Sequence, residues 1–443
     1  MKRRASLLAM FTAGALALSA CAFGGTTGNP PAGGGETTPA ATSTGPVTGE
    51  ITIWSWDVAA VALERLAAEY QKEHDGVTIN VTDIGYDNAY DKISVGMQAG
   101  TGLPDIITLE TDRSPGYITG FPNALTDLTP SLGDDKADFD PFKWAAGSDA
   151  DGKLRVAPWD SGPVGLFYRT DYFKDAGIDP ASIKTWDELV DAGVKIKEKT
   201  GHTLISTGLT GSGLFQMLLQ QQGQGLFDAA GDITFSTPEA VQVLTLIKSM
   251  NDKGLIKNVK GWDARVTSAK DGDSAVTPEA VWWIGTLEGE APELSGKYGV
   301  RDLPVFSDGG ARTSNSGGSG LAVPTQAKNP ALATDFVKYV LANKDNQASM
   351  MKNEGLFPSY LPALQTPFFQ EPSEYFGGEK VYELFATLTG EIPEISFSAD
   401  SSQASDLLGN TVSQVVLNGA DPKQALDDAA KQLANATGRK IAG

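Results

Sequence analysis

The sequence predicts an α/β fold, in which strands of parallel sheets alternate with helices. Short runs with strand spacing are separated by segments with helical spacing, in the order strand, helix, strand, helix, strand. The chain has 443 residues, and the part from Glu50 onward is long enough for two ordinary domains. We therefore expect two α/β units.

The first unit begins at residues 51–54, Ile-Thr-Ile-Trp, which are predicted to form a strand. A helix follows, with Leu63 and Tyr70 on one face. Strand spacing returns at 77–81 and, after a further helical stretch, at 105–109. This order predicts a parallel sheet covered by helices.

A second unit of the same kind is predicted to begin near residues 165–169. Its first long helix starts with the capping box Thr185-Trp-Asp-Glu188, in which each end residue satisfies a free backbone amide of the other. Further helix starts are predicted where proline occupies the first turn, because its missing N–H costs nothing there. They are Ser236-Thr-Pro-Glu239, Asn329-Pro330 and Asp421-Pro422.

The N-terminus has the layout of a secretory signal peptide. Three basic residues at 2–4 precede an uncharged, largely apolar stretch at 5–17 and the sequence Leu-Ser-Ala at 18–20. The apolar stretch is too short for a permanent membrane anchor, which needs ~20 residues. We expect residues 1–20 to be removed.

Cys21 is the only cysteine of the chain and cannot form an internal disulfide. Its position after Leu-Ser-Ala resembles the lipobox of bacterial lipoproteins, which implies that Cys21 becomes the lipidated first residue of the mature chain. The alternative is an incidental cysteine in a discarded leader. Residues 22–49 are small and polar, with Glu36 as the only charge, so we expect 21–49 to be a flexible tether with a reach of roughly 30 Å.

The folded part of the chain is strongly acidic. Residues 1–20 contain three basic residues and no acid, so their removal changes the formal net charge from −20 to −23. Such a surface is repelled by phosphate backbones, which argues against nucleic acid as a partner. No segment after residue 49 is long and apolar enough to span a membrane.

Enzyme motifs are missing from the sequence. His74 and His202 are the only histidines, and neither lies in a zinc-binding arrangement. Ser316-Gly-Gly-Ser-Gly320 lacks both the glycine of a nucleophile elbow and the Gly-Lys-Ser/Thr of a phosphate loop. We predict no catalytic residue, metal or cofactor. Paired carboxylates of a glycosidase remain an alternative, because acidic residues are abundant.

Aromatic and acidic residues follow the ends of the predicted strands, at the edge where ligands bind in α/β sheets. Sugars have apolar faces that stack on aromatic rings and hydroxyls that bond to carboxylates, so these residue types together suit a sugar site. The alternative is that the tryptophans fill the core and the acids cap helices. The segments are Trp54-Ser-Trp-Asp57, Glu110-Thr-Asp-Arg113, Trp159-Asp160 and Trp282-Trp283.

Taken in order, several segments resemble the family 1 extracellular solute-binding proteins of ABC sugar importers, the group that includes maltose-binding protein. The resemblance covers nearly the whole folded part. It is carried by residues 51–57 (Ile-Thr-Ile-Trp-Ser-Trp-Asp), 99–106, 112–117, 157–159, 166–173, 185–189, 300–304 and 317–324.

The resemblance implies the periplasmic-binding-protein fold of type II, two α/β lobes joined by hinge strands with the ligand in the cleft between them. Lobe 1 would comprise 50–156 and 305–357, and lobe 2 would comprise 157–304 and 358–443. The chain would cross between the lobes near Pro158, Pro304 and Pro358. Ligand contacts with both lobes would favour a closed form.

The resemblance also places the ligand-binding residues. Family cleft positions fall on Trp56, Asp57, Asp112, Arg113 and Trp282. Five further residues are added. Glu110 lies on the same rim as Asp112, and Trp159 and Asp160 lie beside the first hinge. Gly317 and Gly318 offer backbone groups at close approach, because they lack side chains.

The family pattern is not matched everywhere. Maltose-binding proteins have an aromatic residue where Leu109 stands and an acidic residue where Gly162 stands. A maltodextrin ligand is therefore not predicted. The Trp-Asp-x-Gly-Pro segment at 159–163 is closer to family members associated with lactose- and arabinose-type ligands.

We therefore expect a monomeric receptor, lipid-anchored on the extracytoplasmic face of the cell membrane. It would bind a sugar, expected to be an oligosaccharide, and deliver it intact to the two permease subunits of an ABC importer driven by a separate ATPase. Two alternatives are a secreted carbohydrate-active enzyme and a binding protein of the same fold for polyol phosphates, peptides or metal ions.

Overall fold

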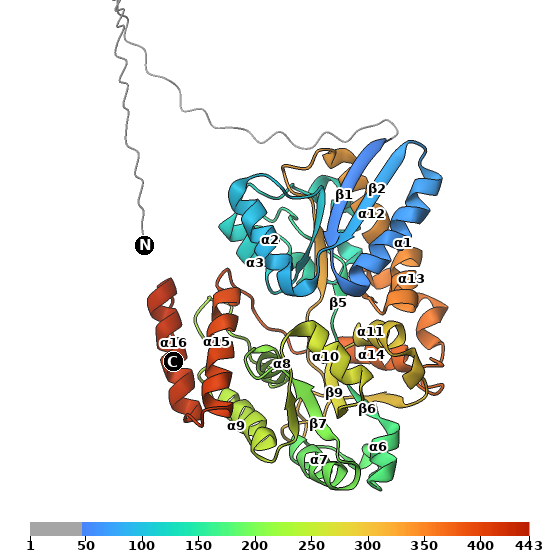
Figure 1. Ribbon diagram of the computed structural model, residues 1–443. Coiled ribbons are helices and arrows are strands. Elements are labelled where there is room, and N and C mark those ends of the chain that lie inside the picture. Colours follow the sequence, from blue (N-terminus) through green and yellow to red (C-terminus); the bar gives the residue numbers. More distant parts are fainter. Residues whose placement is uncertain (1–46, 443) are drawn as a thin grey trace, which may run out of the picture. The chain divides into compact units, whose positions relative to one another are not determined.

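The structure is a computed structural model that describes residues 47–442 (Figure 1). The predicted signal peptide, Cys21 and nearly all of the predicted tether lie outside these residues. The described residues fall within one compact unit, Ala40–Gly443. That unit contains two five-stranded sheets, which we treat as the centres of lobe 1 and lobe 2.

The sheet of lobe 1 has the strand order β2-β1-β3-β11-β4. Strand β1 pairs in parallel with β2 and β3, whereas β11 is antiparallel to both β3 and β4. The three strands predicted here are thus confirmed as parallel, and β4 and β11, which the prediction did not include, make the sheet mixed. The strands are β1 Gly49–Ser55, β2 Val77–Asp83, β3 Ile106–Glu110, β4 Ala157–Pro158 and β11 Ser319–Ala322.

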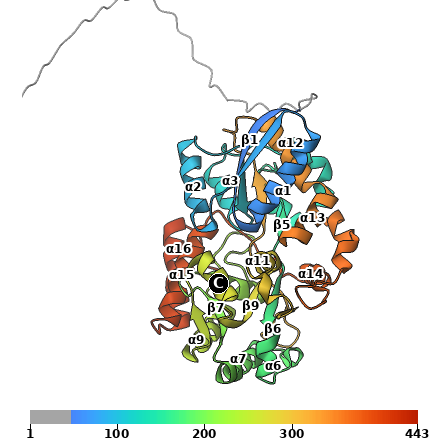
Figure 2. The same ribbon diagram turned by 45° about the vertical axis from the view of Figure 1, so that its right-hand side comes forward.

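Helices lie against this sheet (Figure 2). In α1, Leu63, Leu66 and Tyr70 are fully buried against β1 and α12, as the helical spacing predicts. The helices of lobe 1 are α1 Asp57–Glu73, α2 Tyr86–Ala99, α3 Ser114–Gly120, α4 Thr129–Leu132, α5 Pro141–Ala146, α12 Pro330–Leu341 and α13 Lys344–Glu354, with a 3-10 turn at Gly133–Asp138.

The sheet of lobe 2 has the strand order β10-β6-β9-β7-β8. It is also mixed, because β7 is parallel to β8 and β9 while β6 is antiparallel to β9 and β10. The strands are β6 Val164–Arg169, β7 Thr203–Thr207, β8 Ile256–Asn258, β9 Ser274–Ala280 and β10 Tyr298–Arg301.

Several helices of both lobes begin where the sequence predicts a helix start. The Thr185–Glu188 capping box is present at α7. The Asn329, Thr237 and Asp421 side chains accept backbone N–H groups at the starts of α12, α9 and α16. The helices of lobe 2 are α6 Thr170–Asp175, α7 Trp186–Thr200, α8 Gly213–Gln221, α9 Pro238–Asp252, α10 Gly261–Lys270, α11 Trp283–Glu290, α14 Val381–Thr389, α15 Ser401–Val416 and α16 Pro422–Thr437.

The chain passes between the sheets at several points. Strand β5 (Asp160–Ser161) follows β4 and pairs with β12 (Phe357–Pro358), which forms a separate two-stranded ribbon. The segment before β11 lies beside lobe 2, since Val305 pairs with Thr185 and Asn315 pairs with Pro163. Residues 305–315 therefore lie with the second sheet, beyond the expected crossing at Pro304.

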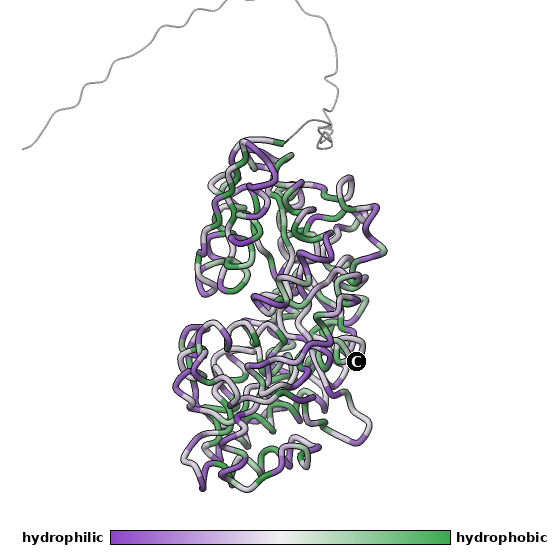
Figure 3. Tube along the Cα trace, turned by 90° about the vertical axis from the view of Figure 1, so that its right-hand side faces the viewer, coloured by the Kyte–Doolittle hydropathy of each residue, from purple (hydrophilic) through white to green (hydrophobic). Residues whose placement is uncertain are grey.

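Hydrophobic residues are distributed along the whole described trace and do not form one long run (Figure 3). None of the helices within residues 47–442 combines the length and the apolar character needed to cross a membrane. Within the same range, no cluster of three or more His, Cys, Asp or Glu side chains is arranged to hold a metal ion.

Candidate ligand-binding cleft

A cleft is lined by residues of both lobes, and its first part, which we call the inner section, gathers most of the predicted site. The empty space of this section is about 820 Å³, including space open to solvent. Its polar and aromatic lining consists of Trp56, Asp57, Tyr86, Glu110, Asp160, Trp262, Arg265, Glu279, Trp282, Thr286 and Ser316 to Ser319.

Three tryptophans from different segments line the inner section. Trp56 follows β1 and packs against Tyr86, with ring centroids 5.6 Å apart. Trp282 follows β9, lies 5.5 Å from Trp262 of α10, and donates its indole N–H to the Ser316 carbonyl at 3.1 Å. That bond fixes the ring, which is only partly buried, so its part in the cleft lining can stack against an apolar face of a ligand.

Glu110, at the end of β3, is held by three neighbours. Tyr90 Oη donates to Oε2 at 2.8 Å, Tyr86 Oη donates to both carboxylate oxygens, and Arg113 Nε donates to Oε2 at 3.3 Å. Burial raises the pKa of Glu110, and the charge of Asp112 adds to this, while Arg113 and the two phenols oppose it. The result is a fixed, poorly hydrated carboxylate that can accept a hydrogen bond from a ligand hydroxyl.

Asp57 begins α1 in a strained backbone conformation. Its φ is 53°, and it is the one non-glycine residue with positive φ in the described range; such conformations cost ~1–3 kcal/mol and concentrate at functional sites. Burial raises the pKa of Asp57 to about 6, with further contributions from Asp83 and Glu290. The positive φ and the raised pKa both mean that holding the ionised Asp57 carboxylate in the cleft lowers the stability of the folded protein.

A buried polar network supports the floor of the inner section. Asp160 Oδ1 accepts the backbone N–H of Ser319 at 2.8 Å and its hydroxyl at 2.5 Å. Lys143 Nζ donates to Thr111 Oγ1 at 2.8 Å, and Thr111 Oγ1 donates to the Gly318 carbonyl at 2.9 Å. Burial lowers the pKa of Lys143 and raises that of Asp160, while their mutual attraction opposes both shifts.

Two glycines are required where the chain passes this network. Gly317 and Gly318 have φ values of 66° and 84°, which favour glycine. A Cβ on Gly317 would lie 3.6 Å from Trp282 Nε1 and 3.8 Å from Glu110 Oε1, so the missing side chain leaves room between them. A Cβ on Gly318 would overlap Lys143 Nζ.

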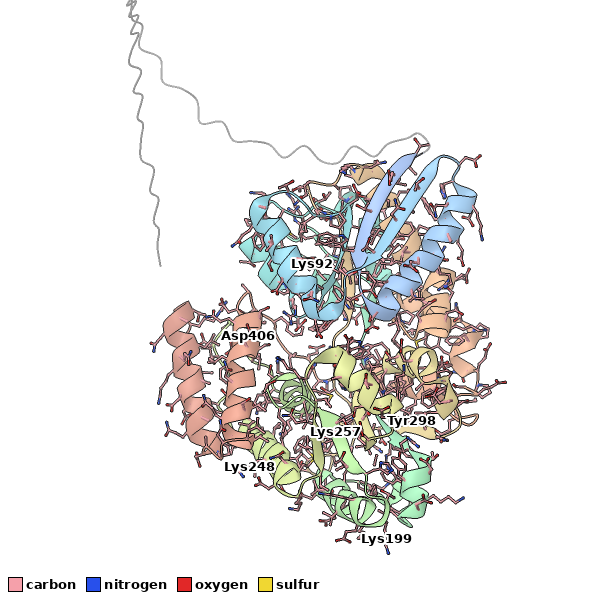
Figure 4. The ribbon with its side chains drawn as sticks, viewed as in Figure 1. Lys92, Lys199, Lys248, Lys257, Tyr298 and Asp406 are labelled. Atoms are coloured by element: carbon pink, nitrogen blue, oxygen red, sulfur yellow. The ribbon has the colours of Figure 1, made fainter. Side chains whose placement is uncertain are left out.

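Arg265 is the one basic side chain that lines the cleft among the described residues. It is paired with Glu279 and lies over the Trp283 ring, 5.3 Å from its centroid. The lysines labelled in Figure 4, including Lys92 on α2 and Lys257 on β8, do not line the cleft. Since carboxylates outnumber this single paired cation, the cleft is poorly suited to a phosphate or another anion.

A second part of the cleft, which we call the amide section, adjoins the inner section at Ser316 and Gly317. Asp112 is its one charged residue within the described range. Burial raises the pKa of Asp112 although Arg113 and Lys143 oppose this, and its Oδ1 is buried without a hydrogen-bond partner among the described residues. The polar and aromatic lining also includes Gln216, Gln220, Gln224, Asn315, Ser396, Phe397 and Ser401.

The structure separates the predicted ligand-binding residues into three groups. It brings seven together around the inner section and places Asp112 in the amide section, while Gly317 lines both. Arg113 lines neither section; it lies over the Tyr90 ring, 4.1 Å from the centroid, and supports Glu110. The seven are Trp56, Asp57, Glu110, Asp160, Trp282, Gly317 and Gly318.

Trp159 requires a correction, because it is fully buried in the core of lobe 1. Its indole N–H contacts Met350 Sδ at 3.2 Å, and it does not line the cleft. Trp262 was not among the predicted ligand-binding residues, yet the structure places it in the cleft wall. Gln216 and Gln220 were also missed, although their spacing of four residues within α8 places them on one helix face.

Comparison with known proteins identifies the family. The family model described as "Bacterial extracellular solute-binding protein" matches residues 56–347. This chain belongs to that family, as the motifs in its sequence predict.

Named relatives and a solved structure agree with this assignment. The chain is 30% identical over 367 residues to a lactose-binding protein of Rhizobium radiobacter, which covers 80% of this chain and 85% of the relative. It is 28% identical over 397 residues to an arabinooligosaccharide-binding protein of Bacillus subtilis (strain 168), covering 87% and 92%. The ABC transporter associated binding protein from B. animalis subsp. lactis Bl-04, solved with beta-1,6-galactobiose, superposes with a TM-score of 0.80 at 25% identity, covering 90% of this chain and 100% of that one.

These similarities confirm the predicted fold class, a two-lobed periplasmic-binding-protein fold of type II. They also place the chain among the sugar-binding solute receptors of ABC transporters.

Proposed function

We propose that this protein binds an uncharged oligosaccharide in the cleft and delivers it unchanged to the permease subunits of an ABC importer. The observation that carries the proposal is the convergence of Trp56, Trp262 and Trp282 with the carboxylates of Asp57 and Glu110 in one section. Rings supply stacking surfaces, and poorly hydrated carboxylates supply strong acceptors for hydroxyl groups.

The ligand class is narrowed by charge and by the relatives. Arg265 is already paired with Glu279, so a phosphorylated or acidic sugar would meet unbalanced carboxylates. Relatives are named for lactose and for arabinooligosaccharides, and a structural neighbour holds beta-1,6-galactobiose. We propose a neutral galacto- or arabino-oligosaccharide, held by Trp56, Asp57, Glu110, Asp160, Trp282 and the backbone of Gly317 and Gly318.

Residues 1–49 support a lipid-anchored form. We propose that cleavage after Ala20 leaves a lipidated Cys21, and that the polar segment to residue 49 tethers a monomeric receptor outside the cytoplasmic membrane. A tether of this composition would let the receptor reach permease subunits in the same membrane. Metabolic labelling with a radioactive fatty acid should label the wild-type chain and not the Cys21→Ser variant; labelling of both would contradict the anchor.

We further propose that the β5–β12 ribbon is part of a hinge. It carries Asp160, and its Ser161 and Ser359 hydroxyls lie 3.3 Å apart on neighbouring chain segments. Closure around a ligand that contacts both lobes would be favoured by its higher affinity for the closed form.

The experiment that tests the proposed function is a thermal-shift screen of the purified full chain against neutral mono- and oligosaccharides, with sugar phosphates and peptides as comparison sets. A ligand at a hundred times its Kd adds about 2.7 kcal/mol of stability, which should raise the melting temperature for one class of neutral oligosaccharide. Stabilisation by sugar phosphates alone would contradict the proposal. Chromatography of the incubated sugars tests the enzyme alternative, which predicts shorter products.

A further inference from the structure

The amide section differs in chemistry from the inner section beside it. Its lining contains no tryptophan, and its hydrogen-bonding groups are mainly side-chain amides and hydroxyls. Asp112 is its one charged residue in the part of the chain that the structure describes, and no basic side chain lines it there. Such a surface suits an uncharged ligand rich in hydroxyl groups.

Two glutamines in this section are held through their side-chain amide nitrogens, while their amide oxygens have no partner among the described residues. Gln216 Nε2 donates to Ser212 Oγ at 2.8 Å and to Ser405 Oγ at 3.0 Å. Gln220 Nε2 donates to the Pro393 carbonyl at 3.0 Å. Neither Oε1 atom has a partner among the described residues, so each is a fixed acceptor on the lining of the section. A fixed acceptor loses little entropy when a ligand hydroxyl binds to it.

An aromatic side chain completes this lining. Phe397 lines the section from the segment before α15, and its ring packs against Phe142 of α5, with centroids 5.7 Å apart. The ring is partly buried and held by this contact. It therefore offers an apolar surface beside the two glutamine oxygens, which is the combination that a sugar ring requires.

The two sections are joined where a side chain is missing. Gly317 lines both, and a Cβ at this position would project toward Trp282 and Glu110. Glu110 lines the inner section and Asp112, two residues later, lines the amide section. A ligand longer than one sugar ring can pass over Gly317 from one section to the other.

We propose that the amide section is a second sugar subsite, in which Gln216 and Gln220 bind a further glycosyl unit of the same ligand and so determine the preferred chain length. This inference rests on the proposed function, because it assumes that the inner section holds a sugar. Helix α8, which carries both glutamines, would thus help to select the length of the bound sugar. The ligand class that follows is a neutral oligosaccharide of at least two units.

Calorimetric titration of the full chain with galacto-oligosaccharides and arabino-oligosaccharides of one, two, three and four units tests this subsite. The variants are Gln216→Ala, which truncates a half-buried side chain, and Gln220→Met, which keeps the volume of a buried one. Gln222→Ala is the matched control, since Gln222 is a neighbouring glutamine outside the cleft that donates to the Glu239 carbonyl.

In the series that binds, the wild-type chain should gain affinity from one unit to the longer sugars. Gln216→Ala and Gln220→Met should each bind the longer sugars up to about tenfold more weakly than the wild-type chain, which is the effect of one hydrogen bond. Their affinity for the single sugar unit should stay unchanged, and Gln222→Ala should keep the wild-type affinity for every length. Equal losses for short and long sugars, or no loss, would overturn the subsite while leaving sugar binding intact. Failure of the wild-type chain to bind any sugar would overturn the proposed function and the subsite with it.

Discussion

Lys143 and Asp160 carry opposite charges and lie buried beneath the cleft, almost inaccessible to solvent, where the charge of each favours the ionised form of the other. Lys143 belongs to α5 of lobe 1, and Asp160 belongs to β5, which follows the last strand of that sheet. Asp160 in turn holds Ser319 at the start of β11. The pair therefore fixes the segment that carries Gly317 and Gly318.

Removal of the Lys143 charge should destabilise the protein strongly. Lys143→Met leaves Asp160 buried without its counter-charge, which typically costs about 3–5 kcal/mol. Lys431→Met is the matched control, because Lys431 forms an exposed pair with Asp428 and should contribute less than about 1 kcal/mol. Urea unfolding measures both values, and equal effects would show that the buried pair is not coupled to stability.

Substitution of Gly318 should cost more than substitution of an open glycine with similar backbone geometry. Gly318→Ala adds a Cβ that overlaps Lys143 Nζ, whereas Gly309, with φ of 76°, has no atom within 4 Å of such a Cβ. Gly318→Ala and Gly309→Ala both force alanine into a backbone conformation that favours glycine, which costs about 1 kcal/mol or more. In calorimetry, the melting temperature of Gly318→Ala should therefore fall further than that of Gly309→Ala. Equal melting temperatures would argue against the packing described at Gly318.

Two tryptophan variants should separate ligand binding from stability. Trp282→Ala removes a cleft ring and should weaken binding of the best oligosaccharide by roughly ten- to a hundredfold. This range follows from the about 1–3 kcal/mol that a flat ring such as a nucleic-acid base gains by stacking on an aromatic side chain. Trp159→Phe should lower the melting temperature with little change in affinity, because Trp159 is in the core. Loss of affinity in Trp159→Phe without loss of stability would restore Trp159 to the site.

Asp57 should make the stability of the unliganded protein depend on pH. Its folded pKa of about 6 lies above the ordinary value of 3.8, so the folded state binds the proton more tightly than the unfolded state. The penalty for ionisation is absent below pH 3.8, grows between pH 3.8 and 6, and is complete above pH 6.

Relative to Asp57→Asn, the wild-type chain should therefore lose roughly 1–3 kcal/mol of unfolding free energy between pH 3.8 and 6. Denaturant titrations at several pH values measure this difference. A difference that stays constant over this range would contradict the raised pKa.

Much of the fold could be predicted because its signals are local. Residues 51–54 and 77–81 alternate at strand spacing, and Thr185, Asn329 and Asp421 cap the helices that follow them. The antiparallel pairing of β11 could not be predicted in this way. It depends on where the chain returns to the sheet after lobe 2, which is a property of the tertiary structure.

The site was predictable to the extent that its residues lie at strand ends. Trp56 follows β1 and Glu110 ends β3, and these two parallel strands end at one edge of the same sheet. Trp282 lies shortly after β9 of the other sheet. Trp159 and Asp160 are neighbours whose side chains turn to different surroundings, one into the core and one to the cleft. In extended chain, adjacent side chains alternate, and the sequence does not reveal which of the two faces inward. Trp262 and Gln220 lie on helices whose cleft faces only tertiary packing defines.

Isothermal titration calorimetry of the full chain tests most directly whether the cleft binds a neutral oligosaccharide. The sugar is recovered after the titration, and its chain length is analysed. We predict saturable binding with one ligand per chain, loss of that binding in Trp282→Ala, and recovery of the sugar with its chain length unchanged. Binding that survives in Trp282→Ala, recovery of shortened sugars, or no heat with any neutral oligosaccharide would contradict this prediction.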